Sequence, residues 1–457
     1  MTKTPPLYEA MQDPVPAERF TSTQVCNLVL EQALPLSPFH EGSSDRRDAV
    51  YGLVRPVDLE RMAVDVRGHR LLNSDQTNQL GGSYKLRGST HALLAALDAD
   101  PALTDVHIAS AGNAANGALQ ACLALGQRLG RALRLGAECT TGASETKMGI
   151  LQYGGATVNN RHARFVDARE AARVLGEQPG HVTLDAYDAV ETIAGQATVG
   201  WETLFDLVGQ ASVGRIDLHH TPIKLFVPVG GGGLISGIAS VMFWAKEQGL
   251  IGQNVQVIGV QMQGCDAMKR YRDYVLSGEL PPADLFADGL RFSGKADGTA
   301  VETPGELTRA VCSDPNFVAD IVTVSEGELG LAMANATRCH GYEIEPAGAL
   351  SLAGACLYAG EHPAQPRAGA PSETLITFTT GANVAPDLYE YFMLAAAGLL
   401  ESRRLAGAAA LDAYRDVLNG FANVGLSRHR GRPDGGAPAR RARSAGSKVW
   451  SSPVGRQ

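Results

Sequence analysis

The chain has 457 residues and a formal net charge of −8, and 19% of its residues are charged. This length favours two domains plus extensions, and the composition is that of a soluble globular protein. An acidic chain without an apolar run of about 18 residues argues against a nucleic-acid enzyme and against a membrane helix, so we expect neither partner.

The charge is unevenly spread along the sequence. Residues 426–457 contain seven Arg and one Lys against one Asp, a balance of +7, so the remainder carries −15. This basic tail is rich in Gly, Pro, Ser and Arg, which predicts disorder. An arm that binds nucleic acid or a protein partner is the alternative interpretation of the tail.

The seven cysteines are scattered and include no C-x-x-C pair. An odd, dispersed set argues against a disulfide framework and against a zinc site, so no metal is expected. We interpret the cysteines as small buried hydrophobes in a reducing compartment. The first twenty residues lack the apolar segment of a signal peptide, and the expected location is cytoplasmic.

In chain order, the first expected element is a capped amphipathic helix over 21–34, which Pro35 ends. A helix over 89–97 follows, with Ser89 as its N-cap. Strands and helices then alternate. The expected strands are 105–110, 162–167, 181–185, 223–229, 255–262, 320–325 and 374–380. The expected helices are 114–126, 145–156, 188–209, 234–249, 265–278, 326–341, 346–360 and 387–405.

Near-continuously apolar strands alternating with helices predict parallel sheets covered by helices on both faces. The expected fold class is therefore α/β, with two domains that each contain a largely parallel sheet. We expect a large discontinuous domain formed by 1–104 and 195–400, and a small α/β domain over 105–194. Residues 401–457 are expected to form the end of a helix and the disordered tail.

Four consecutive glycines, Gly230, Gly231, Gly232 and Gly233, follow the apolar strand 223–229 and precede a helix. Glycines let several backbone N–H groups point toward one site, and the helix N-terminus adds positive potential, which suits phosphate. A flexible linker is the alternative, although a linker is not normally held between a buried strand and a helix. Because neither a Walker A pattern nor a dinucleotide pattern is present, the phosphate should belong to a smaller molecule.

A lysine, Lys85, lies in the segment "GGSYKLRGS", surrounded by small residues. Lysine acts as a nucleophile or base only if its pKa falls, through burial or through a nearby cation such as Arg87. A solvated structural lysine is the alternative. A reactive lysine combined with a phosphate site is the binding pattern of pyridoxal phosphate.

Five motifs with small and polar residues occur along the chain. They are "GGSYKLRGS" (81–89), "SAGNAANGA" (110–118), "PVGGGGLISG" (228–237), "EPAGALSLAG" (345–354) and "TTGAN" (379–383). Their order resembles that of fold-type II pyridoxal-phosphate enzymes, and the sequence most resembles the threonine/serine dehydratase (ammonia-lyase) group, over roughly residues 30–390. "IAGQATVGWE" (193–202) and "ADGTAV" (296–301) are further similar segments.

The resemblance implies pyridoxal 5'-phosphate as the cofactor and a role for each motif. Lys85 would join the cofactor as an aldimine, and the four glycines would hold its phosphate. Asn113 would bond the ring hydroxyl, and Thr380 would face the pyridine nitrogen. Ser110, Ala111 and Gly112, at the start of a helix, would receive the substrate carboxylate.

Three of these motifs also have structural interpretations, which the sequence leaves open. Asn113 could cap the helix that begins at Ala114, and Thr380 could bond its own turn. Glu345 could simply precede a helix that starts at Pro346.

The resemblance implies β-elimination from threonine, serine or another β-hydroxy amino acid, giving a 2-oxo acid and ammonia. The alternatives are a β-replacement synthase, or an eliminase acting on another β-substituted amino acid. Ala114 and Asp185 stand where the dehydratases usually have histidines, and this puts the substrate in doubt. Ala111 replaces the serine of racemases, and Tyr84 replaces a usual Phe. Family members commonly form homodimers, and no regulatory domain is expected after residue 400.

Overall fold

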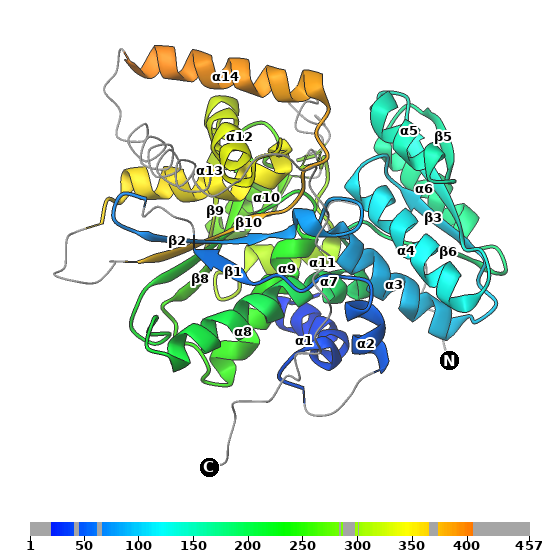
Figure 1. The fold of residues 1–457 in the computed structure, drawn as a ribbon, viewed down its shortest axis with the longest axis horizontal. Coiled ribbons are helices and arrows are strands. Elements are labelled where there is room, and N and C mark those ends of the chain that lie inside the picture. The colour runs from blue at the N-terminus through cyan, green and yellow to red at the C-terminus, as the bar shows by residue number, and fades with distance from the viewer. Residues whose placement is uncertain are drawn as a thin grey trace, which may run out of the picture.

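The structure is a computed structural model that describes residues 20–40, 45–61, 66–282, 285–286, 298–299, 301–364 and 373–404. Its strands form two sheets, one central and one to the right in Figure 1. The larger sheet has six strands in the order β1-β2-β10-β7-β8-β9, and the smaller has four in the order β5-β4-β3-β6. Among the described strands, all pairings are parallel except that of β1 with β2. The expected α/β class is confirmed.

The strands of the larger sheet come from both ends of the described chain. They are β1 (Leu59–Arg61), β2 (Arg70–Asp75), β7 (Ile223–Pro228), β8 (Val255–Met262), β9 (Asp320–Val324) and β10 (Thr374–Thr379). The strands of the smaller sheet are contiguous in sequence. They are β3 (Asp105–Ala109), β4 (Arg134–Thr140), β5 (Thr157–His162) and β6 (His181–Thr183). The exact domain boundaries given above stay a prediction.

Helices cover both faces of the larger sheet (Figure 1). On one face lie α1 (Ser22–Ala33), α7 (Val190–Gln196), α8 (Thr198–Ser212), α9 (Gly233–Glu247) and α11 (Glu306–Ser313), with α10 (Ala267–Ser277) beside α11. On the other lie α12 (Glu326–His340), α13 (Pro346–Glu361) and α14 (Pro386–Arg404). The smaller sheet is covered by α4 (Asn113–Leu129) and α5 (Glu145–Tyr153) on one face and α6 (Phe165–Gly176) on the other. The remaining elements are η2 (Leu34–Leu36), α2 (Asp45–Tyr51), η3 (Gln76–Asn78) and α3 (Lys85–Ala99).

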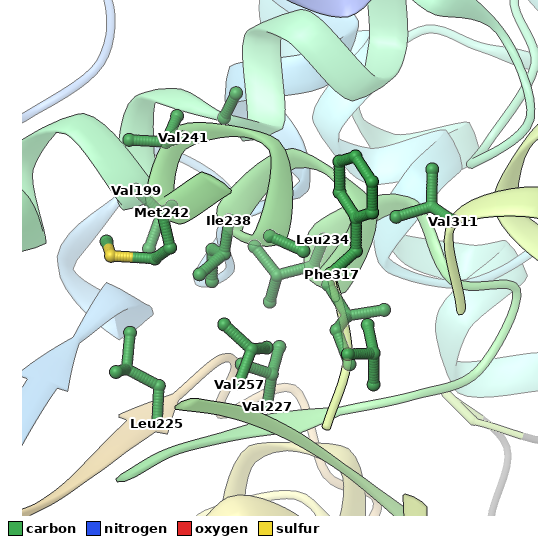
Figure 2. Close-up of a cluster of buried hydrophobic side chains, with 14 of the residues drawn as sticks. Val199, Leu225, Val227, Leu234, Ile238, Val241, Met242, Val257, Val311 and Phe317 are labelled. Carbon is green, nitrogen blue, oxygen red and sulfur yellow. The ribbon is translucent and has the colours of Figure 1, made fainter. Parts of the chain in front are cut away.

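The larger sheet has a core cluster on each face, and one of them forms between α9 and the strands β7 and β8. Figure 2 shows Leu234, Ile238 and Met242 of α9 facing Leu225 and Val257 of the sheet. All five side chains are at most 2% exposed. Strands buried on both faces explain the near-continuous apolar runs in the sequence.

One expected strand is wrong, and four strands, β1, β2, β4 and β5, were not expected from the sequence. The segment 162–167 is not a strand, because β5 ends at His162 and α6 begins at Phe165. Ala168 and Ala172 of α6 are buried against the sheet at helical spacing, whereas β5 is a polar edge strand without apolar alternation. The strand β4 lies over 134–140, where none was expected.

Two expected helices also differ in their limits. The helix expected over 188–209 is divided into α7 and α8, with a break at Ala197. The helix α3 begins at Lys85 and not near Ser89, which is buried within it. Within the described residues, no helix is both long and apolar enough to span a bilayer. The expected tail, and the expected lack of a regulatory domain, concern residues 405–457, which lie outside the described residues.

Candidate active site

The small residues around Lys85 allow two helices to pack against the start of α3. A Cβ on Gly117 of α4 would lie 2.9 Å from the carbonyl carbon of Lys85. A Cβ on Gly195 of α7 would lie 2.5 Å from the carbonyl oxygen of Arg87. Because only glycine permits such an approach, these positions fix the backbone that carries the lysine.

The Lys85 amine points into the protein. Its Nζ donates to the carbonyl oxygen of Ala186 at 2.8 Å and lies 5.3 Å from the centre of the Tyr84 ring. Burial lowers the pKa of Lys85 to about 8, against the charge of Asp185, which raises it. A larger share of the amine is therefore neutral near physiological pH than in an exposed lysine. Its hydrogen bond to Ala186 disfavours the solvated alternative.

Arg87 does not supply the cation that the sequence suggested. Its guanidinium is fully buried and donates to both carboxylate oxygens of Glu202, at 2.6 and 2.9 Å. It also donates to Gln76 and Thr198. With its charge balanced by Glu202, Arg87 joins α3 to α8, and the pKa of Lys85 is lowered by burial.

One short segment, residues 185–188, contacts both the lysine and the glycine run. Ala186 accepts the hydrogen bond from Lys85, and the ring of Tyr187 lies directly against Gly231. A Cβ on Gly231 would overlap the Tyr187 ring, and one on Gly233 would come within 2.8 Å of the Tyr187 carbonyl oxygen. The structure thus places Lys85 and the glycines in contact with one segment.

The glycine run is an ordered turn between β7 and α9. Gly232 has φ +94 and is the N-cap residue of α9, a conformation that favours glycine. The carbonyl oxygen of Gly231 accepts a hydrogen bond from Thr308 at 2.7 Å. The first N–H groups of an α-helix have no partners within the helix, so this turn offers donors for an anion. The linker alternative is wrong.

Asn113 is held at both ends of its amide. Its Nδ2 donates to Glu345 Oε1 at 2.5 Å, and its Oδ1 accepts from Asn383 Nδ2 at 2.8 Å. Asn113 is the first residue of α4 and Gly112 is the N-cap, so the capping alternative is wrong. Glu345 does precede a helix that starts at Pro346, as the other alternative stated. Its side chain is buried and also accepts the hydrogen bond from Asn113.

The loop before Lys85 pairs with the loop that contains Thr380. The N–H of Tyr84 donates to the Thr380 carbonyl at 3.1 Å, and the N–H of Ala382 donates to the Gly82 carbonyl at 3.1 Å. The Thr380 hydroxyl donates to the carbonyl of Ala347 in α13 at 3.0 Å, so it does not bond its own turn. This pairing places "TTGAN" beside "GGSYKLRGS".

Residues Ser110, Ala111 and Gly112 form the turn between β3 and α4. All three are partly exposed, and the Ser110 hydroxyl accepts from the N–H of Gly112 at 3.1 Å. A partly open turn at a helix start suits a carboxylate. No hydrogen bond joins this turn to Lys85 among the described contacts, and its role stays a prediction.

Two residues at this site, Asn383 and Gln196, were not predicted from the sequence. Asn383 belongs to a quoted motif, but only the fold shows that it contacts Asn113. Gln196 is fully buried, and neither atom of its amide has a hydrogen-bond partner among the described residues. Its amide lies between α3 and the glycine run, 3.0 Å from a Cβ on Gly88 and 2.6 Å from one on Gly233. The motif "IAGQ" contained the signal, since a polar residue stands alone among small apolar ones.

Residues 55–372 match the family described as "Pyridoxal-phosphate dependent enzyme". The chain belongs to this family. Its cofactor is therefore pyridoxal phosphate, and the recognition made from the sequence motifs is confirmed.

Curated relatives of this pyridoxal-phosphate family member include threonine dehydratases and a racemase. The chain is 32% identical to L-threonine dehydratase biosynthetic IlvA of Pasteurella multocida, over 73% of this chain and 58% of that protein. It is 29% identical to serine racemase of Arabidopsis thaliana, over 65% of this chain and 79% of that protein. The chain thus spans about three fifths of the length of the threonine dehydratases it matches.

Solved structures show the same fold. The processed threonine deaminase isoform 2 from Solanum lycopersicum superposes with a TM-score of 0.60 at 24% identity, covering 85% of this chain and 91% of that one. The maize serine racemase superposes with a TM-score of 0.58 at 23% identity, covering 79% of this chain and 97% of that one.

The site of this family member fits its cofactor on three structural observations. The Lys85 amine is partly buried with a lowered pKa, and the glycine turn leaves no space for a Cβ at Gly231. The Asn113 amide has two N–H groups, of which Glu345 takes one, so the other can serve a ring hydroxyl. At Thr380 the hydroxyl hydrogen must rotate away from Ala347 to reach a ring nitrogen.

Proposed function

We propose that this chain catalyses β-elimination of a β-hydroxy amino acid such as threonine or serine, releasing a 2-oxo acid and ammonia. The observation that carries the proposal is the Lys85 amine, with its pKa lowered to about 8, bonded to the same segment, 185–188, that the glycine turn contacts. The similarity to threonine dehydratases over most of the chain supports the substrate class.

Pyridoxal phosphate, when bound, supplies the electron sink for breaking bonds at Cα and Cβ. The chain's own residues would do the rest. The glycine turn, Gly230–Gly233, would hold the phosphate through backbone N–H groups, and Asn113 would orient the ring. The neutral amine of Lys85 would take the proton from Cα, since its lowered pKa suits a general base near neutral pH. The turn over Ser110, Ala111 and Gly112 would bind the substrate carboxylate.

The test is the variant Lys85→Ala in the full chain. We expect the variant to remain folded and to form no 2-oxo acid from threonine or serine, because it lacks both the covalent anchor and the base. Lys246→Ala is the matched control, because burial also lowers the pKa of this lysine, at the opposite end of α9 from the glycine turn. Undiminished product formation by Lys85→Ala would overturn the proposal. Product formation by the wild type without an added nucleophile separates elimination from β-replacement.

The substrate's β-substituent is the open part of the proposal. Asp185 and Ala114 stand where histidines are usual in the dehydratases, so a β-substituted amino acid other than threonine or serine is the alternative substrate. A panel of such amino acids, scored by 2-oxo acid release, identifies which one the site turns over fastest.

We further propose a cytoplasmic homodimer. The six described cysteines are buried free thiols, which is usual for proteins of reducing compartments. Dimerisation is expected from the family resemblance. Light scattering of the purified chain should give twice the mass of one chain.

A further inference from the structure

A partly buried ion pair lies next to the segment that contacts Lys85. Arg169 of α6 donates through Nη2 to Asp185 Oδ2 at 2.7 Å. The mechanism proposed above uses neither side chain. The carboxylate is mostly buried, whereas the arginine side chain is nearly half exposed at 43%. The ion pair therefore has a more exposed end at Arg169 on α6 and a less exposed end at Asp185, beside the residue that contacts Lys85.

Asp185 sets the shape of the segment 185–188. Its Oδ1 accepts the N–H groups of Tyr187 and Asp188, at 3.0 and 2.8 Å. Its backbone carbonyl accepts the hydroxyl of Thr192 at 2.8 Å. With Arg169 on Oδ2, the side chain is held in one orientation, and the adjoining Ala186 carbonyl is presented to Lys85.

The charge of Asp185 also reaches the lysine. Burial would raise the pKa of Asp185, but Arg169 and the two N–H groups outweigh burial and hold this pKa below its usual range. Asp185 is thus a carboxylate near neutral pH, and its charge favours the protonated form of Lys85. A paired carboxylate attracts a proton to its neighbour less than an unpaired one does.

Other charged groups face this region from the elements around it. Asp188 of the same segment accepts hydrogen bonds from N–H groups at the start of α11. The charge of Arg309 of α11 favours the ionised form of Tyr187. The charge of Glu345, at the start of α13, helps to raise the pKa of Tyr84. Among these groups, Arg169 is the one that forms an ion pair with Asp185.

We propose that Arg169 is a positioning residue for Lys85. By pairing with Asp185, it holds the segment 185–188 in place and offsets the carboxylate charge that would otherwise keep a proton on the lysine amine. The inference rests on the proposed function only in taking Lys85 as the reacting amine.

The experiment measures the Lys85 amine directly. The full chain, freed of cofactor and shown to be folded by circular dichroism, is labelled with acetic anhydride across pH, and the Lys85 peptide is quantified by mass spectrometry. Arg169→Gln should move the midpoint of labelling upward by about one pH unit, so that labelling near neutral pH falls about tenfold. Arg169→Lys should retain most of the wild-type profile. Because labelling requires no turnover, its result is independent of whether the proposed reaction occurs.

A double-mutant cycle separates an effect through Asp185 from a direct one. Asp185→Asn should move the midpoint downward, and Arg169→Gln should then add little in that background. Arg173→Gln is the matched control, since Arg173 lies one turn further along α6 and pairs with Glu170. The proposal is overturned if Arg169→Gln leaves the midpoint unchanged, or raises it equally with and without the Asp185 charge.

A second measurement keeps the proposal testable if Asp185→Asn does not fold. The visible absorbance of the cofactor-loaded chain is titrated with pH in the wild type, Arg169→Gln and Arg169→Lys. The Gln variant should titrate at a higher pH than the other two. Identical titrations in all three proteins contradict the inference.

Discussion

At the scale of single residues, the amide of Asn113 shows how one contact determines another. An amide presents an acceptor at one end and donors at the other, and these are exchanged if it flips. Asn383 donates to Oδ1, so the donor end of Asn113 must face Glu345 and the site. Asn383 itself is anchored by a bond to the Gly81 carbonyl at 2.7 Å.

Asn383→Asp should therefore weaken cofactor binding. A carboxylate at 383 would repel Asn113 Oδ1 and favour the flipped amide, which turns an acceptor toward Glu345. The loss of one such hydrogen bond, about 1 kcal/mol, corresponds to about fivefold weaker binding, measured by reconstituting the cofactor-free chain. Gln120→Ala is the control, because Gln120 bonds Asn116 and not Asn113. Unchanged cofactor affinity in Asn383→Asp would show that Asn383 does not determine the orientation of the Asn113 amide.

The candidate site residues could be picked out from the sequence where a motif supplied them, and their contact partners could not. Lys85, Asn113 and the glycine run each stand in a quoted motif, and the structure brings them to one region. The pairing of Arg169 with Asp185 joins a helix to a loop across sixteen positions, and no periodicity in the sequence encodes it. Arg87 was misjudged because its partner Glu202 is 115 residues away.

At the scale of elements, the close packing of Tyr187 on Gly231 links the 185–188 segment to α9. The glycine is required here by its neighbour, since the ring occupies the space of a Cβ. The same holds for Gly232, whose Cβ would lie 2.7 Å from the Thr308 Cβ. The glycine turn thus combines N–H groups that lack partners within α9 with contacts that leave no room for side chains.

Gly231→Ala should destabilise the fold by about 1–3 kcal/mol, the usual cost of overpacking, and should weaken cofactor binding. Urea unfolding of the cofactor-free chain measures the first effect. Gly209→Ala is the matched control, because Gly209 lies in α8 with nothing within 4 Å of the position that a Cβ would take, and alanine there should stabilise by about 0.5–1 kcal/mol. Adding Tyr187→Leu to Gly231→Ala should recover part of the loss. If the double variant is destabilised by the sum of the single effects, the ring is not the cause.

Element boundaries were predictable where apolar runs are long, and less so elsewhere. The strands β7 and β8 and the helix α9 lie within two residues of their expected limits, because buried parallel strands carry continuous apolar sequence. At the edge of the smaller sheet, β5 has a polar sequence, and its pairing with β4 is what makes it a strand. The expectation for 162–167 failed for this reason.

At the scale of the whole molecule, several buried ionisable groups make stability depend on pH. His91 of α3 is 2% exposed and hydrogen-bonds through Nδ1 to the carbonyl of Glu191, the first-turn residue of α7. Burial lowers its pKa to about 4. Asp188 behaves in the opposite sense, because burial and the charge of Asp185 raise its pKa to about 7.

The signs of these two contributions follow from proton binding. The unfolded chain protonates His91 near its ordinary pKa of 6.5, whereas the folded chain resists until about 4. The contribution of His91 is therefore fully present above pH 6.5 and is lost as pH falls from 6.5 to 4. For Asp188, the folded chain takes up a proton more readily than the unfolded chain. Its contribution to the free energy of unfolding therefore increases as pH falls from 7 toward 3.8.

His91→Asn isolates the first contribution, because asparagine can still donate to the Glu191 carbonyl but does not titrate. The free energy of unfolding of wild type minus variant should fall by on the order of 3 kcal/mol between pH 6.5 and 4. The contribution of Asp188 cancels in this difference, because Asp188 titrates alike in both proteins. A difference that stays constant across this range would mean that His91 is protonated in the folded chain, and that the α3–α7 contact beside Lys85 does not depend on a neutral imidazole.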